Sequence, residues 1–195
     1  MQTGRVNASN YEQIAPFPDE SSPEKDYLLN VIIETPRATR HKYAFDAKTG
    51  LFKLKSTIAE GLQWPYDYGF VPGTLGQDGD PIDALFLNDE PSFPGCFTEA
   101  RLLGIIRLQK NGEQNDRLVT CAKRIDGISL STDPYETIAD VPKSVIDSLR
   151  RFLVEYSEGA GNRVQCSGVE GREKALEAVQ RGIAAFQKKH ADAAG

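Results

Sequence analysis

The sequence predicts a mainly β fold that ends in α-helices, an α+β class. Between residues 27 and 125, short β-rich segments alternate with turn signals, and after Asp140 apolar residues recur at helical spacing. Short strands that follow one another so closely are typical of an antiparallel barrel or sandwich. With 195 residues, of which 39% are hydrophobic, the chain is long enough for one domain with a substantial core.

Six segments carry the strand pattern: residues 28–34, 42–46, 51–54, 82–87, 101–109 and 117–125. Turn signals separate them, including Lys48-Thr49-Gly50 and Lys110-Asn111-Gly112. Because Asn-Gly between two apolar runs favours a tight turn, the second signal predicts a hairpin.

Two amphipathic helices are predicted in the last third. The first begins after Asp140 with Pro142 in its first turn, and the second spans about residues 172–189. Their apolar faces are interpreted as core contacts. These faces are formed by Val145, Ile146, Leu149, Phe152, Leu153 and Tyr156 in the first helix, and by Leu176, Val179, Ile183 and Phe186 in the second.

The ends of the chain differ from this predicted domain. Residues 1–26 are polar, contain three prolines and end in a charged run, which predicts an extended arm outside the core. Residues 27–190 are predicted to form a single domain and residues 191–195 a tail. The arm is a candidate interface element in an oligomer.

Composition limits the compartment and the partners. A formal net charge of -5 argues against nucleic acid or an anionic membrane as the main partner. No apolar stretch approaches the roughly 18 residues of a membrane span, and the first residues lack the apolar core of a secretory signal. Cys96, Cys121 and Cys166 are odd in number and widely separated, which favours reduced thiols. We therefore expect a cytoplasmic protein.

Three carboxylates, those of Asp78, Asp80 and Asp83, lie within six positions. Each raises the cost of ionising its neighbours, so the cluster needs water or cations around it. A strand beginning near Pro81 would point Asp83 and Leu85 to the same face, carrying one carboxylate into the barrel beside two at its rim. Bound hard cations explain this arrangement better than a solvated turn does.

Magnesium, with manganese as the alternative, is the cation that the residues favour. An EF-hand calcium loop counted from Asp78 would need its glycine where Asp83 stands. Zinc is poorly supported because the chain has only two histidines, His41 and His190, which form no ligand-spaced pair. Mg²⁺ or Mn²⁺ would be held by one or two carboxylates together with a substrate phosphate.

The run Asp-Gly-Asp-Pro-Ile-Asp at residues 78–83 matches the signature of the soluble family I inorganic pyrophosphatases, which the chain resembles. Other stretches are similar to this family in order and spacing. They are residues 31–36 (VIIETP), 42–43 (KY), 65–70 (PYDYGF), 101–119 and 152–156. The resemblance covers roughly residues 27–186.

The resemblance implies a closed five-stranded OB-like β-barrel flanked by two C-terminal amphipathic helices. It also implies that a metal-activated water hydrolyses pyrophosphate to two phosphates, and that the protein is a homo-oligomer, either a dimer or a hexamer. By motif position, Asp80 would be the catalytic base, and the metal ligands would be Asp78, Asp83 and Glu34. The residues implied to bind the substrate phosphates are Lys42, Lys55, Tyr68, Arg117 and Tyr156.

Several positions depart from the family pattern. Ala44 stands in place of a glutamate, Lys55 in place of an arginine and Trp64 in place of a tyrosine, which alters bidentate geometry and removes a hydroxyl. On the long helix, Ser157 stands in place of a lysine.

The central hairpin departs further. Lys110 and Asn115 stand where the family has two metal-ligating aspartates, and Arg117 follows in place of a lysine. Asp116 and Glu113 are candidate compensating acids if a bulge or a longer turn brings one of them inward.

Two alternatives to a working pyrophosphatase therefore stay open. The first is a weakened or inactive relative that acts as a phosphate-binding, metal-binding or regulatory subunit. The second is an enzyme that hydrolyses a different phosphoanhydride or a phosphate ester in an altered pocket.

Overall fold

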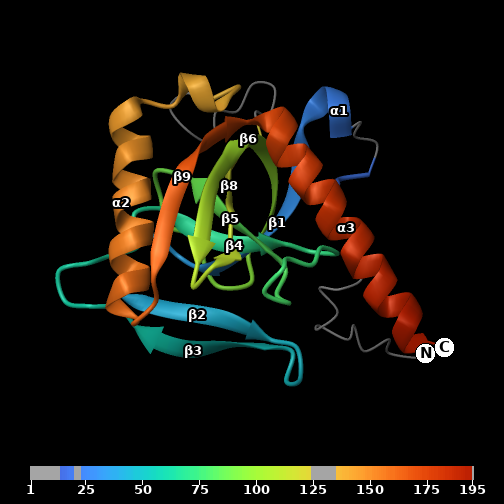
Figure 1. Cartoon of the computed structure of the whole chain (residues 1–195), viewed down its shortest axis with the longest axis horizontal. Helices are drawn as coiled ribbons and strands as arrows, with labels where there is room; N and C mark the ends of the chain where they lie inside the picture. Colours follow the sequence, from blue (N-terminus) through green and yellow to red (C-terminus); the bar gives the residue numbers. More distant parts are fainter. Residues whose placement is uncertain (1–13, 20–22, 124–134, 195) are drawn as a thin grey trace, which may run out of the picture.

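A β-barrel forms the centre of the molecule, with a separate hairpin and two long helices around it (Figure 1). This computed structural model describes residues 14–19, 23–123 and 135–194. The first part of the predicted arm, the end of the strand expected at 117–125 and Gly195 lie outside these ranges.

Five strands close the barrel, as the family resemblance implies. In order around the ring they are β1 (Leu28–Thr35), β4 (Asp67–Val71), β5 (Ile82–Leu87), β8 (Arg117–Ala122) and β6 (Phe97–Lys110). Pairing of β1 with β6 completes the ring.

One pair of neighbours in the ring is parallel. β5 and β8 run in the same direction, whereas the other neighbours are antiparallel. The expectation of a wholly antiparallel barrel is therefore wrong at this pair. The chain leaves β5, returns along β6 and turns into β8, so β8 lies beside β5 with the same direction.

β6 is the longest strand and carries most of the pairing. Beyond the ring it also pairs with β7 (Glu113–Gln114) and β9 (Val164–Gly171). The tight turn between β6 and β7 confirms the predicted hairpin, because Asn111 and Gly112 both have positive φ, 54° and 89°.

Two apolar clusters lie on the two sides of the barrel wall, one inside the barrel and one outside it. One receives side chains from all five ring strands, as the interior of a barrel does, and α3 (Arg172–Ala194) packs against it through Leu176 and Val179. The other lies outside β4, β5, β6 and β8, where α2 (Lys143–Gly159) adds Leu149, Phe152 and Leu153. The helical stripes therefore have the predicted core role except at Phe186, which belongs to neither cluster.

Asp83 faces outward from the barrel. Along β5, Ala84 and Phe86 belong to the interior cluster, whereas Leu85 and Leu87 belong to the outer one. Since side chains alternate along a strand, Asp83 lies on the face of Leu85 and Leu87. The expectation of a carboxylate inside the barrel is wrong because both faces of β5 are buried, so apolar neighbours do not identify the inner one.

The remaining elements are β2 (His41–Asp46) and β3 (Leu51–Thr57), which form the separate hairpin, a short α1 (Pro23–Asp26) and a 3-10 turn (Ile138–Asp140) before α2. The hairpin turn has the predicted sequence, and the amide N–H of Gly50 donates to the Asp46 carbonyl at 2.8 Å. α3 continues to Ala194, so residues 191–194 are helical where a tail was expected.

The described part of the predicted arm packs on the barrel. The backbone N–H of Asn30 donates to the Pro16 carbonyl at 2.9 Å, and the Asn30 side chain donates to the Ala15 carbonyl at 2.9 Å. Phe17 packs against the interior cluster. Residues 14–19 are therefore held by the domain. Within the described ranges, no helix has the length and apolar character needed to span a membrane.

Candidate active site

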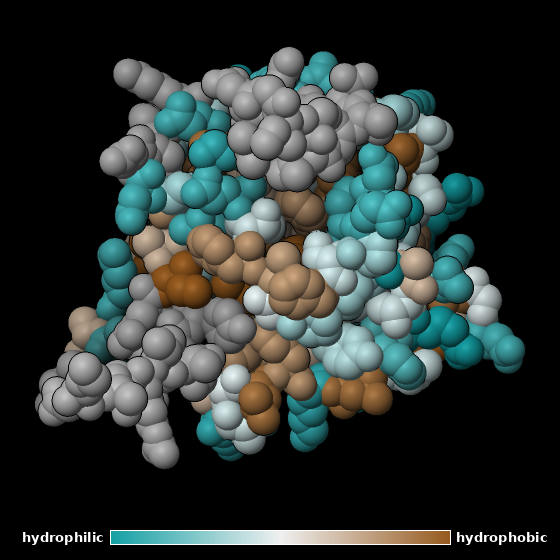
Figure 2. Space-filling view, turned by 180° about the vertical axis from the view of Figure 1, so that it is seen from behind, coloured by the Kyte–Doolittle hydropathy of each residue, from teal (hydrophilic) through white to brown (hydrophobic). Residues whose placement is uncertain are grey.

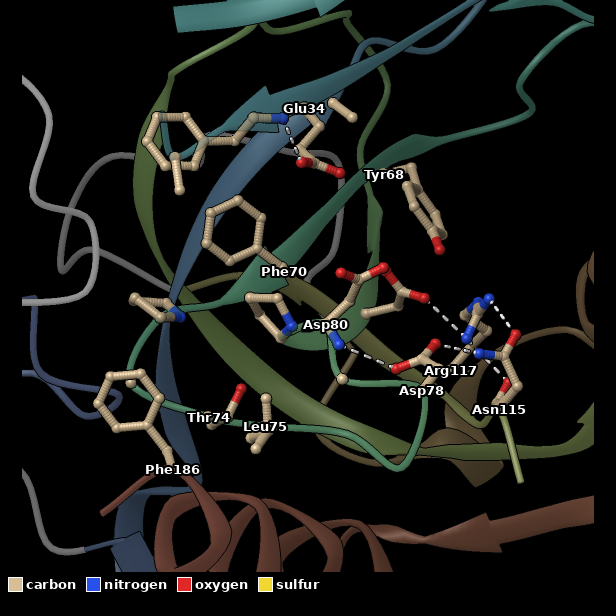
Figure 3. A pocket seen from close by; sticks show the side chains of 18 of the residues that line it. Glu34, Tyr68, Phe70, Thr74, Leu75, Asp78, Asp80, Asn115, Arg117 and Phe186 are labelled. Atoms are coloured by element: carbon tan, nitrogen blue, oxygen red, sulfur yellow. Dashed lines mark hydrogen bonds and ion pairs between the residues drawn. The ribbon is translucent and has the colours of Figure 1, made fainter. Parts of the chain in front are cut away.

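A cavity of about 440 Å³ opens where the outer face of the barrel meets the β2–β3 hairpin and the end of α3. Figure 3 shows Asp78, Asp80, Asn115 and Arg117 gathered on one side of it, and Phe70, Leu75 and Phe186 on the other. The predicted site residues that line this cavity are Glu34, Lys42, Lys55, Tyr68, Asp78, Asp80, Asp83 and Arg117.

The loop between β4 and β5 presents the first two signature acids. The Thr74 hydroxyl donates to the Val71 carbonyl at 2.6 Å and accepts from the Ile82 N–H at 3.0 Å, which ties the two ends of the loop together. Within it, the Gly76 N–H donates to the Asp80 carbonyl at 2.7 Å. The left-handed φ of Gly79, 85°, completes the turn that places Asp78 and Asp80 at the cavity.

A chain of polar contacts joins four side chains, two from the acidic signature and two from the central hairpin. The Asn115 amide donates to Asp78 Oδ2 at 2.6 Å, and its oxygen accepts from Arg117 Nη2 at 2.6 Å. Arg117 Nη1 pairs with Asp83 Oδ2 at 2.8 Å. The other oxygen of Asp78 accepts from the Asp80 N–H at 3.2 Å. Asp78 and Asp83 are therefore both engaged by nitrogen donors in this structure (Figure 3).

Burial and neighbouring charges shift the pKa values of several residues at this site. Burial opposes the charge of the Arg117 guanidinium, but Asp83 beside it keeps the pKa of Arg117 above its usual value. Burial also raises the pKa of Asp78, and the charges of Asp83 and Asp80 add to that rise. Burial raises the pKa of Tyr68 well above its usual value, so its hydroxyl remains a neutral donor near neutral pH.

Glu34 stands apart from the other acids, on β1 (Figure 3). Its Oε1 accepts the Phe45 N–H at 2.7 Å, which ties β1 to the β2–β3 hairpin. Burial raises the pKa of Glu34 to about 7, against the opposing effect of that hydrogen bond, and the charge of Asp83 adds to the rise.

Lys42 and the two predicted tyrosines form a second polar group. Lys42 Nζ donates to the Tyr156 hydroxyl at 2.9 Å and lies 5.6 Å from the ring centre of Tyr68. Tyr156 is not among the cavity-lining residues, so it reaches the cavity through Lys42. Trp64 packs behind both tyrosines, with ring centres 4.8 and 5.0 Å away.

The two candidate compensating acids do not line the cavity. Asp116 faces away from it, because it accepts from Arg107 Nη1 at 2.7 Å and from the Leu108 N–H at 3.0 Å. Glu113 is exposed at the start of β7, beside a smaller hollow that Asp78 and Lys110 also line. Compensation by Asp116 would therefore require that it leave Arg107.

The acids of the cavity have the donor chemistry that magnesium or manganese needs. Within the described ranges, no three His, Cys, Asp or Glu side chains converge closely enough to hold a metal ion by themselves. Mg²⁺ is commonly held by one or two carboxylates and completed by water and substrate phosphates. Asp78, Asp80, Asp83 and Glu34 fit that mode as oxygen donors on one cavity.

Several lining residues were not predicted as site residues. Phe186 was interpreted as a core position of α3, but it lines the cavity together with Lys189 and His190. Phe45 and Phe70 also line it. The signal available in the sequence was the spacing of the three α3 residues, which places them on one helix face.

The fold and the site together define a class of protein: a barrel that brings clustered carboxylates and several cationic side chains to one cavity, as required to bind a polyanion with divalent cations. Residues 31–187 match the family model described as inorganic pyrophosphatase. The chain is 33% identical over 165 residues to soluble inorganic pyrophosphatase 1 of Arabidopsis thaliana, covering 83% of this chain and 74% of that protein.

Solved structures agree with this match. Inorganic pyrophosphatase from Thermus thermophilus superposes with a TM-score of 0.80 at 27% identity, covering 92% of this chain and 99% of that one. The Helicobacter pylori enzyme superposes with a TM-score of 0.77 at 29% identity, covering 87% and 99%. The chain therefore belongs to the family I soluble inorganic pyrophosphatases.

Proposed function

We propose that the chain hydrolyses inorganic pyrophosphate to two phosphates and uses Mg²⁺ as its cation, with Mn²⁺ as a substitute. The observation that carries this proposal is the meeting of Asp78, Asp80 and Asp83 with Lys42 and Arg117 around one cavity. Family membership supports the same reaction.

The acids divide between two roles. Bound divalent cations lower the pKa of a water molecule and neutralise charge on the phosphates. Asp78, Asp83 and Glu34 would hold them. The Asp80 carboxylate would accept the proton of the attacking water, since its backbone is fixed by Gly76 and Asp78 while its carboxylate lines the cavity.

The cationic side would bind the phosphates. Lys42 and Lys55 extend from the β2–β3 hairpin, and Arg117 from β8, so they approach the substrate from two elements. Tyr68 would donate its hydroxyl proton to a phosphate oxygen. Tyr156 would act as a positioning residue, because it holds the Lys42 ammonium at 2.9 Å.

A lowered turnover follows from the Asp78–Asn115–Arg117–Asp83 chain. Arg117 already neutralises Asp83, and the Asn115 amide already occupies an oxygen of Asp78. A cation must displace these nitrogen donors before both acids can bind it. We therefore propose weaker cation binding than the acids alone would give, and a correspondingly reduced rate.

The setting that we propose is a cytoplasmic homo-oligomer without nucleic-acid or membrane partners. Three free cysteines suit a reducing compartment. Exposed large apolar side chains support self-association, and Figure 2 shows apolar surface gathered across one face of the molecule. Those exposed by half or more of their surface are Leu51, Leu54, Phe93 and Phe97.

Release of phosphate from pyrophosphate tests the proposed reaction. Phosphate release from pyrophosphate should require Mg²⁺ or Mn²⁺, and Asp80→Asn should lower it by about 10²- to 10⁴-fold, the usual contribution of a general base. Asp147→Asn on α2, whose side chain is 46% exposed, is the matched control and should keep wild-type turnover.

Two outcomes would contradict parts of this proposal. Full turnover by Asp80→Asn would remove Asp80 as the base. Absence of turnover by the wild type at every Mg²⁺ and Mn²⁺ concentration, with pyrophosphate still bound, would favour the binding or regulatory subunit instead.

A further inference from the structure

The last turns of α3 form a wall of the candidate active site. Phe186, Lys189 and His190 all line the cavity that contains the signature acids. Their spacing of three and four residues places them on one face of the helix. The rings of Phe186 and His190 pack together, with centres 4.2 Å apart.

α3 is attached to the acidic loop one turn before this wall. The Leu75 N–H donates to the Gly182 carbonyl at 3.0 Å. Gly182 also lets Ile82 approach closely, because a Cβ at this position would lie 2.4 Å from Ile82 Cδ1. The helix and the loop that carries Asp78 and Asp80 are therefore positioned relative to each other.

The cavity has an apolar side that pyrophosphate does not need. Phe70, Leu75 and Phe186 lie on the side away from Arg117 and Asn115 (Figure 3). Pyrophosphate and its cations present only charge and oxygen, so they gain nothing from aromatic rings. An apolar group placed on that side would be removed from water, which is favourable.

The size and charge of the cavity agree with a longer ligand. Its volume of about 440 Å³ falls within the roughly 300–1,000 Å³ of pockets that hold drug-sized molecules. Ala44 and Ala47 give the hairpin side short side chains. Lys189 places a cation beside Phe186, so this end of the cavity is not purely apolar.

The geometry points to a subsite for an aromatic group: the cavity binds diphosphates whose ester substituent contains an aromatic or heteroaromatic ring, with nucleoside diphosphates as the natural class. The diphosphate lies among Lys42, Arg117 and the acids, and the substituent packs on Phe186. This inference rests on the proposed function, because it uses the same diphosphate site.

The test uses the methyl and phenyl monoesters of methylenediphosphonate, whose P–C–P link cannot be hydrolysed. Calorimetric titration in Mg²⁺ should show that the full-length protein binds the phenyl ester about 3- to 10-fold more tightly than the methyl ester, the range expected of an aromatic pair. Phe186→Ala should abolish this ratio. Gln187→Ala, at an exposed position of the same helix outside the cavity lining, is the control and should keep it.

A second variant separates a loss of helix packing from a loss of binding of the aromatic group. Phe186→Leu retains an apolar side chain in the wall and should lower the ratio while the protein stays folded. Equal affinity of the wild type for both esters would overturn the subsite, and so would an unchanged ratio in Phe186→Ala. If either result is obtained and unsubstituted methylenediphosphonate still binds, the diphosphate site is supported and only the subsite is rejected. If it also fails to bind, the proposed function is overturned too.

Discussion

Arg117 gives the site a counter-charge that belongs to the chain itself. Arg117 is almost buried, with 11% of its side chain exposed, and its pair with Asp83 is therefore poorly screened by solvent. An arginine neutralises an acid but does not lower the pKa of water as a divalent cation does. In this structure Arg117 is therefore the counter-ion of Asp83.

Glu34 should make the stability of the metal-free protein depend on pH. Its pKa is about 7 in the folded protein and 4.5 without the fold, so between these values the folded state holds a proton that the unfolded state has lost. The free energy of unfolding should therefore fall as pH rises from about 4.5 to 7. Thermal unfolding in a chelator across this range measures the effect.

The matched variants for this prediction are Glu34→Gln and Glu155→Gln. Glutamine retains an oxygen that can accept the Phe45 N–H, so Glu34→Gln should fold and should lose this part of the pH dependence. Glu155→Gln, on the exposed side of α2, should keep the wild-type profile. A profile unchanged by Glu34→Gln would assign the dependence to another group.

The charged residues of the cavity could be predicted from the sequence, whereas the residues of its apolar side could not. The order and spacing of carboxylates and cations along the chain indicate such a site, and eight of the predicted site residues line one cavity. Phe186 was assigned to the core because an aromatic residue on an amphipathic helix usually packs there. Asp116 faces away from the cavity because it pairs with Arg107, and spacing along the chain does not reveal this pairing.

At the scale of the elements, a strand was predicted correctly where its hydrophobic pattern and its flanking turn residues were clear. β5 was predicted at its observed bounds because turn residues precede an apolar run there. β4 was missed because all five of its residues are buried and it shows no alternation. β9 was missed because Ser167 and Gly168 interrupt its apolar pattern, and its pairing with β6 depends on a distant partner.

Gly69 lets β1 and β4 approach, and this predicts a large effect of a small substitution. A Cβ at Gly69 would lie 1.9 Å from the Ile32 carbonyl oxygen, which belongs to the backbone and cannot rotate away. Gly69→Ala should lower the free energy of unfolding by about 1–3 kcal/mol or more, as overpacking does. Urea unfolding measures the change.

Gly168→Ala is the control for that substitution, because nothing lies within 4 Å of a Cβ there. It should change stability by about 0.5 kcal/mol at most, as a strand position without a clash does. Equal losses in the two variants would mean that general strand propensity, and not the contact with Ile32, explains Gly69.

At the scale of the whole molecule, the N-terminal segment contributes to the stability of the domain. A truncation that begins at Tyr27 removes the Ala15 and Pro16 carbonyls that pair with Asn30, a residue only 6% exposed. Each buried donor left unpaired should cost about 1–3 kcal/mol. We expect a lower unfolding temperature than that of a truncation beginning at Ile14, which keeps both partners.

Gel filtration of the same two truncations separates this role from assembly. An unchanged elution position for both would remove the segment from the interface, leaving its role within the domain. A loss of oligomer only when residues 14–26 are removed would place the interface there. Equal unfolding temperatures would contradict the stabilising role of the Asn30 contacts.

The way in which the barrel closes also determines when it can fold. β1 cannot pair until β4 and β6 have been synthesised, and β5 has no second neighbour until β8 has been synthesised. Pairings between segments so far apart in the chain form slowly, and until then their edges are open to other chains. A growing or refolding chain should therefore be most prone to aggregation just before β8 appears, and a helper protein that shields strand edges would act at that moment.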